Sequence, residues 1–203
     1  MIPILAAAAE AAGLALRGGF HPTPDDAVPP LPSGGAAATL LLLGWTGPRQ
    51  WPEFTATPEY RDGAPHPLDR WSRRVVGALA AAFGAVPLFP FGGPPFQPFL
   101  RWAPRAEPVH PSPIGLLIHP DWGLWHAWRG ALTFPERLDL PAPDQRASPC
   151  ETCATQPCRV AVSFQLARCA CPVGLPYGAA QAEFHRAAFE RRPRINSEKS
   201  CPD

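Results

Sequence analysis

The sequence has almost no excess of charge of either sign. Its 203 residues carry a formal net charge of +1 at pH 7. Proteins that bind nucleic acid or anionic membranes through electrostatics carry a basic excess, so neither kind of partner is expected. The chain also lacks a long apolar run, because the leucines at 40–43 are followed directly by Gly44. About 20 apolar residues are needed to cross a bilayer, and no transmembrane helix is therefore predicted.

No export signal is predicted from the N-terminal residues. The apolar stretch at 4–9 follows no basic residue and is interrupted by Glu10, unlike a secretory signal peptide. We therefore expect a cytoplasmic protein whose cysteines are reduced. In that setting a cluster of cysteines indicates a metal site rather than a disulfide framework.

Motifs for nucleotide binding and hydrolysis are absent. The sequence contains no P-loop, no G-x-G-x-x-G and no Ser-His-Asp arrangement. Neither a phosphate cradle nor a hydrolase triad is supported, and no catalytic residue is assigned.

Proline and glycine, by contrast, are abundant, with 30 and 17 residues. They predict long, stiff connections between the elements of secondary structure. Seven tryptophans and eleven phenylalanines nevertheless supply enough large apolar surface for a folded core. We expect an α+β protein with a core domain over residues 1–140 and a Cys-rich domain over residues 141–203.

The clearest predicted element is a helix that starts after Pro67 and stops at Gly84, with apolar residues at helical spacing. The other predicted elements are a helix over 4–16 stopped by two glycines, a buried strand over 39–44 (or a helix over the same leucines), a strand over 86–91, a hairpin formed by 114–119 and 124–134, and a last helix over 179–191. Loops are expected over 20–35 and 135–149, and a frayed tail after Pro193.

Five of the six cysteines lie in the last quarter of the chain: Cys150, Cys153, Cys158, Cys169 and Cys171. A C-x2-C opening, a third close cysteine and a distal Cys-Pro are typical of a chain that wraps an iron–sulfur cluster. Thiolates are soft ligands that select such metals. The spacing predicts one cluster, of the 4Fe-4S type, on the first three cysteines and Cys171, with Cys169 as the alternative fourth ligand.

Other interpretations of these thiols remain open. Four residues separate Cys153 from Cys158, whereas the common bacterial motif has two. Tetrahedral zinc is an alternative, but it normally uses a second C-x2-C, and this chain has C-x-C at 169–171. A zinc-stapled interaction protein and thiols without a metal are thus the competing hypotheses. Cys201 is predicted to be a free thiol without a role.

Several motifs resemble known families. The segment 114–130, with its I-H-P-x-x-G-x-W-x-A-x-R-G core, resembles a strand pair of the cobalamin-processing chaperone, the methylmalonic aciduria and homocystinuria type C protein. The Cys-rich tail looks like the ferredoxin appendage of its relatives, epoxyqueuosine reductase and the reductive dehalogenases. The motifs H-P-L-D-R-W, F-P-F-G-G-P-P-F-Q-P-F, H-P-S-P and C-P-V-G resemble small bacterial proteins labelled ferredoxin. This last likeness covers nearly the whole chain.

The resemblance implies a modified nitroreductase-like core followed by a ferredoxin-like appendage. Such a core would bind cobalamin or another corrinoid, near Gly92, Gly93, His119 and Trp125. The cluster would then pass single electrons to cobalt, and an enzyme of this kind would be a corrinoid-dependent reductase. The related reductases carry two clusters on eight cysteines, whereas this chain has thiols for one. A redox partner protein and a homodimer are further expectations, the latter by analogy of fold.

Overall fold

The computed structural model describes residues 1–161 and 163–190. They form two compact units, each described here by itself. The first contains Met1–Trp45, Arg49–Glu107 and Ala127–Gln145, and the second contains Thr46–Pro48, Pro108–His126 and the described residues from Arg146 onward. The two domains predicted over residues 1–140 and 141–203 stay a prediction. The tail predicted after Pro193 lies outside the described residues.

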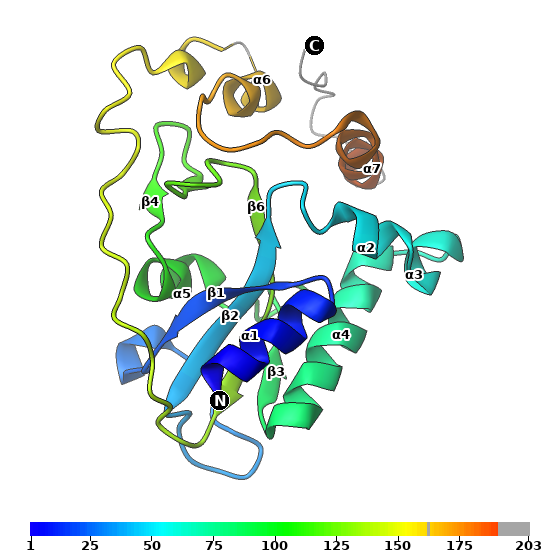
Figure 1. Cartoon of the computed structure of the whole chain (residues 1–203), viewed down its shortest axis with the longest axis vertical. Coiled ribbons are helices and arrows are strands. Elements are labelled where there is room, and N and C mark those ends of the chain that lie inside the picture. Colours follow the sequence, from blue (N-terminus) through cyan, green and yellow to red (C-terminus); the bar gives the residue numbers. More distant parts are fainter. Residues whose placement is uncertain (162, 191–203) are drawn as a thin grey trace. The chain divides into compact units, whose positions relative to one another are not determined.

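A four-stranded sheet with the order β1-β2-β6-β3 organises the first unit (Figure 1). Its strands are β1 (Ala15–Phe20), β2 (Thr39–Thr46), β3 (Val86–Leu88) and β6 (His126–Phe134). β1 pairs antiparallel with β2, and β3 pairs antiparallel with β6. β2 is almost completely buried, as its run of four leucines predicts. The strand predicted over 39–44 is thus confirmed.

The helices of this unit are α1 (Ile2–Ala11), α2 (Trp51–Thr55), α3 (Pro58–Arg61), α4 (Pro67–Phe83) and α5 (Phe99–Ala106), with one 3-10 turn, η1 (Pro24–Asp26). α4 confirms the predicted helix at both ends. Proline is tolerated in its first turn, and Gly84 takes the left-handed conformation that ends it, with φ of 67°. Its apolar residues lie on one buried face.

Three aromatic rings form the centre of the core in the first unit. Trp45, Phe54 and Trp71 lie with ring centroids 5.6 to 5.7 Å apart in tilted or edge-on geometry. All three are nearly inaccessible to solvent. Such rings bury large apolar areas and favour these non-parallel arrangements. They fasten α2 and α4 to β2.

An ion pair is also buried in this unit. Arg17 on β1 donates to the Glu107 carboxylate at 2.8 Å and to the Trp45 carbonyl oxygen at 2.8 Å. Trp128 Nε1 donates to the other carboxylate oxygen of Glu107 at 2.7 Å. Burial raises the pKa of Glu107, while the charge of Arg17 and these hydrogen bonds oppose the rise. The pair therefore has the partners that a buried charge requires.

Three sequence predictions were wrong in detail. The helix predicted over 4–16 ends at Ala11, and Gly18 and Gly19 lie inside β1, where the register with β2 shifts. The segments 114–119 and 124–134 do not form a hairpin. The short strand β5 (Leu117–Ile118) pairs with β4 (His110–Pro111), while β6 joins the main sheet. β3 is also shorter than the strand predicted over 86–91.

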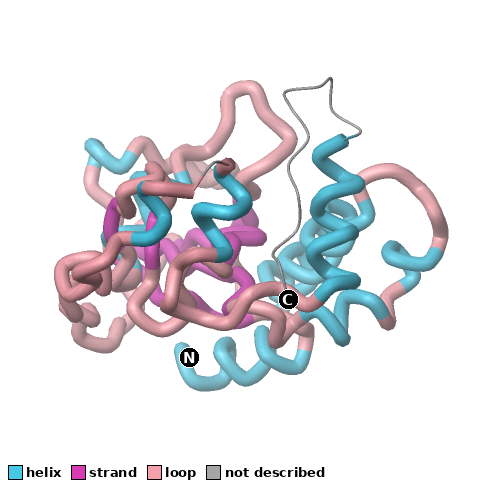
Figure 2. Tube along the Cα trace, turned by 90° about the horizontal axis from the view of Figure 1, so that it is seen from above, coloured by secondary structure: helices cyan, strands magenta, loops and turns pink. Residues whose placement is uncertain are grey.

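The second unit consists mostly of loops, drawn in pink in Figure 2. Besides β4 and β5 it contains η2 (Pro157–Arg159), α6 (Phe164–Cys169) and α7 (Ala179–Glu190). α7 confirms the predicted last helix up to Glu190. Residues 135–149 contain no helix or strand, as the proline content predicts.

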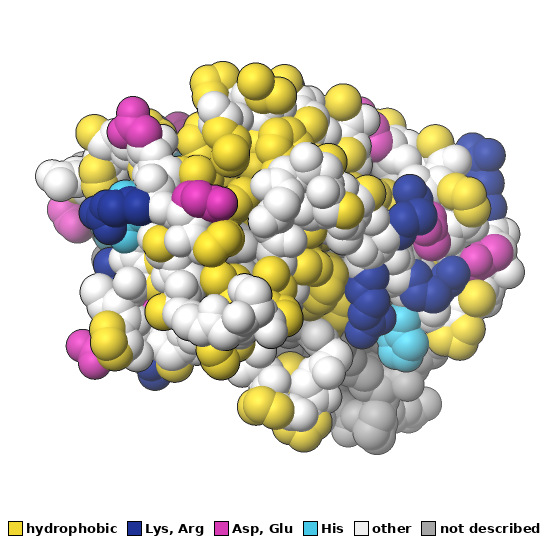
Figure 3. All heavy atoms as spheres, turned by 90° about the horizontal axis from the view of Figure 1, so that it is seen from below, with side chains coloured by type: hydrophobic (Ala, Val, Ile, Leu, Met, Phe, Trp, Pro, Cys, Tyr) yellow, Lys and Arg dark blue, Asp and Glu magenta, His cyan; other side chains and the backbone are white. Residues whose placement is uncertain are grey.

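The small antiparallel sheet and its surrounding helices confirm an α+β protein. The nitroreductase-like core and the ferredoxin-like appendage stay predictions. Among the described residues, none of the helices combines the length and apolar composition needed to cross a membrane. On the face drawn in Figure 3, basic and acidic side chains are interspersed with apolar and uncharged ones.

Candidate metal centre

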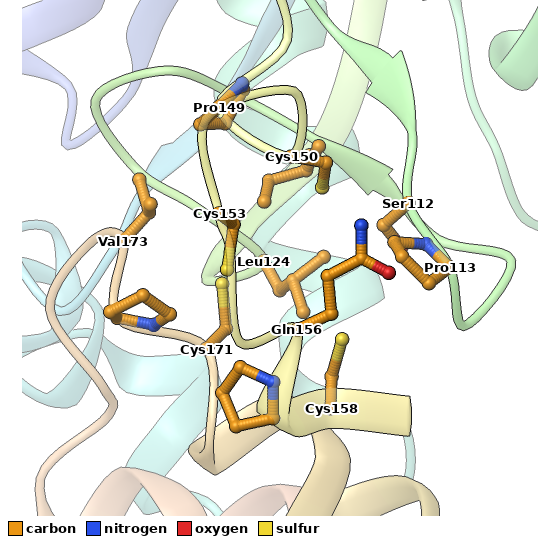
Figure 4. A pocket seen from close by; sticks show the side chains of 13 residues that line it. Ser112, Pro113, Leu124, Pro149, Cys150, Cys153, Gln156, Cys158, Cys171 and Val173 are labelled. Atoms are coloured by element: carbon orange, nitrogen blue, oxygen red, sulfur yellow. The ribbon is translucent and has the colours of Figure 1, made fainter. Parts of the chain in front are cut away.

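Four cysteine thiols line one pocket in the second unit (Figure 4). Cys150, Cys153 and Cys158 come from one short loop, and Cys171 follows α6. All four are partly buried free thiols. Their sulfur atoms point into the pocket, which contains about 360 Å³ not occupied by protein atoms, part of it open to solvent. The structure thus brings together the four cysteines that the spacing predicts as ligands.

Local backbone geometry turns the first three cysteines toward the pocket. The Ser148 hydroxyl accepts a hydrogen bond from Cys150 N at 3.3 Å and so fixes the start of the loop. Gln156 adopts the left-handed conformation, with φ of 39°, immediately before Pro157 and η2. This reversal lies inside the four-residue gap between the second and third cysteines. The longer spacing is therefore compatible with three thiols on one pocket.

The fourth cysteine is held by contacts on both sides of it. Arg168 of α6 donates to the Leu124 carbonyl oxygen at 3.0 Å, and its guanidinium lies 4.1 Å from the centroid of the Trp125 ring. After Cys171, the Val173 backbone runs so close to Gly123 that a Cβ at position 123 would overlap it. These contacts fix the segment from α6 to Val173 against the turn at 122–125.

The remaining pocket lining is mainly apolar: Ile118, Leu124, Val173 and the prolines at 113, 149, 157 and 172. Burial raises the pKa of Cys150 and of Cys171. Hydrogen bonds from Ser148 and from Val173 oppose the rise, and the nearby thiols increase it further. Several thiolates in one apolar pocket repel one another, and this repulsion favours the protonated thiols. A bound metal would neutralise the thiolate charges.

The thiols do not converge on a single point. No group of three or more His, Cys, Asp or Glu side chains in residues 1–161 and 163–190 is placed to hold a metal ion. Tetrahedral zinc bonds each sulfur at about 2.3 Å, which requires four sulfurs close around one centre. A polynuclear cluster presents several metal atoms, and its ligands lie further apart. As donors, four free thiols around an apolar pocket fit such a cluster.

Cys169 is not part of this set. It is disulfide-bonded, unlike the four pocket cysteines, and it does not line the pocket. The expectation that the cysteines are all reduced therefore does not hold for Cys169. Cys201, predicted to be a free thiol, lies outside the described residues.

The residues predicted to bind a corrinoid are divided between the units. Gly92 and Gly93 belong to the first unit, whereas His119 and Trp125 belong to the second. His119 is buried and stacks on Trp122 with ring centroids 3.7 Å apart. Trp125 is also buried and packs against the Tyr177 ring. Both rings thus have protein contacts, and the corrinoid role of these four residues stays a prediction.

The polar residues of the pocket were not predicted from the sequence. Ser112 and Gln156 line it together with the four thiols. The H-P-S-P motif at 110–113 can be recognised in the sequence, but no neighbouring residue indicates that it lies beside cysteines about 40 residues later.

No protein-family model matches the chain, and no curated protein matches it.

Proposed function

We propose that this protein is an electron carrier that binds one iron–sulfur cluster through Cys150, Cys153, Cys158 and Cys171. The observation that carries the proposal is that these four free thiols, from two segments of chain, line a single pocket. Four thiolates are the usual complement for one 4Fe-4S cluster.

The shape of the pocket favours a cluster over zinc. The four thiols line one pocket, yet no three of the described His, Cys, Asp or Glu side chains are grouped around one ion. A zinc ion would require all four to move toward a common centre, whereas a cluster bonds each thiolate to a different iron atom.

The lining suits electron transfer. The prolines and aliphatic side chains limit the number of waters near the sulfurs, and burial is one of the factors that set the potential of a cluster. A bound cluster supplies one-electron chemistry. The residues that line the pocket would hold the cluster and shield it from solvent.

Anaerobic purification tests this proposal. After reconstitution with iron and sulfide, we expect about four iron and four sulfide per chain, as a 4Fe-4S cluster requires. Cys150→Ser and Cys171→Ser should each lose most of both. Cys169→Ser, compared with the unmodified protein after reduction of the disulfide of Cys169, is the control, because it removes a sulfur two residues from Cys171 that does not line the pocket. A folded, iron-free protein, or zinc without sulfide, would refute the proposal.

A corrinoid is the electron acceptor that we favour. The segment 114–130, which resembles the cobalamin-processing chaperone, supplies Ile118 and Leu124 to the lining of the thiol pocket. A corrinoid bound to that segment would lie near the cluster. Adding hydroxocobalamin should then shift its absorption bands in proportion to the protein added. Unchanged spectra at high protein concentration would refute the corrinoid as electron acceptor and leave the proposal of the cluster untouched.

A further inference from the structure

Ser112 lines the thiol pocket and carries a buried hydroxyl group. Only 9% of the residue is exposed, and it lines the pocket together with the four cysteines (Figure 4). In the described part of the chain, its Oγ atom has no hydrogen-bond partner. Burying a hydroxyl without a partner is unfavourable, so such a group indicates a missing acceptor or donor.

The backbone of Ser112 is firmly held. Its N–H donates to the Leu116 carbonyl oxygen at 2.8 Å, and its own carbonyl oxygen accepts from Gly115 N at 3.0 Å. It lies between two prolines, directly after the pair formed by Pro111 of β4 and Leu117 of β5. The residue therefore cannot easily leave the pocket. Rotation of the hydroxyl is the freedom that remains.

We propose that the Ser112 hydroxyl donates a hydrogen bond to a sulfur atom of the cluster and thereby raises its reduction potential. The inference rests on the proposed function. When the cluster accepts one electron from an external single-electron donor, the negative charge on its sulfur atoms increases. A hydrogen bond to sulfur is then stronger in the reduced state, which favours reduction. The proton stays on the serine oxygen throughout, and only the electron moves.

The experiment compares Ser112→Ala with Ser112→Thr in the reconstituted protein. Each sample is poised anaerobically with dithionite and mediator dyes, at the potential where half of the unmodified protein is reduced. Without the hydroxyl, we expect the ratio of reduced to oxidised cluster to fall about tenfold, which is ~59 mV for a one-electron couple. The threonine variant retains the hydroxyl, and its ratio should stay close to that of the unmodified protein.

The possible results separate the two proposals. If the unmodified protein binds no iron and sulfide, the proposed function fails. If both proteins bind the cluster and Ser112→Ala has an unchanged potential, only the role of Ser112 is overturned. Should the alanine variant lose the cluster, resonance Raman spectra of the unmodified protein and Ser112→Thr decide. Iron–sulfur bands that shift in D2O in both support the hydrogen bond, and unshifted bands overturn it.

Discussion

Gly123 lies directly against the backbone of Val173. A Cβ atom at position 123 would overlap the Val173 carbonyl oxygen, and Gly123 also has a left-handed φ of 57°. The two segments are 50 positions apart in the chain, and one of them contains Cys171. This close approach sets where the fourth thiol lies relative to the turn at 122–125.

Gly123→Ala should therefore displace Cys171 and reduce cluster binding. We expect less than about half of the iron and sulfide of the unmodified protein, because one of four ligands is moved. Metal and sulfide analysis after identical reconstitution measures the effect.

Gly115→Ala is the control for this substitution. Gly115 has a similar left-handed φ of 79°, but no atom lies within 4 Å of the position of a new Cβ. Its replacement adds backbone strain of about 1–2 kcal/mol without a steric clash. Full cluster content in Gly115→Ala and in Gly123→Ala alike would contradict the role assigned to the close approach.

The thiols of the metal-free protein should react slowly with alkylating reagents near neutral pH. Burial raises the pKa of Cys150 and Cys171, so at a given pH fewer of these thiols are thiolates than in a free cysteine peptide. Only the thiolate reacts. Timed iodoacetamide labelling of the reduced protein, with mass spectrometry of the peptides, gives the rate at each site. Rates equal to those of the peptide would argue against a shielded pocket.

The same shift fixes the sign of the pH dependence of metal uptake. The raised pKa means that binding must release protons, so affinity for a soft metal ion falls as the pH is lowered. Cadmium titrations of the metal-free protein between about pH 6 and pH 8 should show weaker binding at the acidic end.

The buried ion pair should make a large contribution to the stability of the first unit only while both partners are present. Glu107→Ala leaves the Arg17 charge buried without its carboxylate, at a cost of about 3–5 kcal/mol in the free energy of unfolding. Replacing both residues by apolar ones of similar size should cost less than this single change. Urea denaturation measures both.

An exposed pair serves as the comparison. Glu10 and Arg49 are 3.6 Å apart, with side chains 62% and 73% exposed. Because solvent screens this pair, Glu10→Ala should leave the urea midpoint almost unchanged. If Glu107→Ala lowers the free energy of unfolding as little as Glu10→Ala does, burial does not increase the contribution of the Arg17–Glu107 pair.

Local signals were enough to predict α4 and β2. Pro67 and Gly84 delimit the helix because each suits one end of it, and the leucine run of β2 matches a strand buried on both faces. The secondary structure at these positions follows from residues that are close to them in the sequence. The same holds for the cysteine spacing, which predicted the four thiols of the pocket.

Long-range pairing explains the errors. Two consecutive glycines often end a helix, but here Gly18 and Gly19 lie at a shift of register between β1 and β2. β6 pairs with β3, some 40 residues earlier, rather than with the segment just before it. Apolar alternation predicts a strand but not its partner. Ser112 was missed for the same reason, since its place beside the cysteines comes from tertiary structure.

The position of α6 between the third and fourth thiols has a final consequence. An inorganic group bonded to all four sulfurs would join both ends of the segment from Cys158 to Cys171 and act as a covalent staple across it. Oxygen damage that destroys the group would open that staple and remove one of the links that hold α6, while others, such as the contact of Arg168 with Trp125, would stay. Faster proteolysis of this segment would then report the loss.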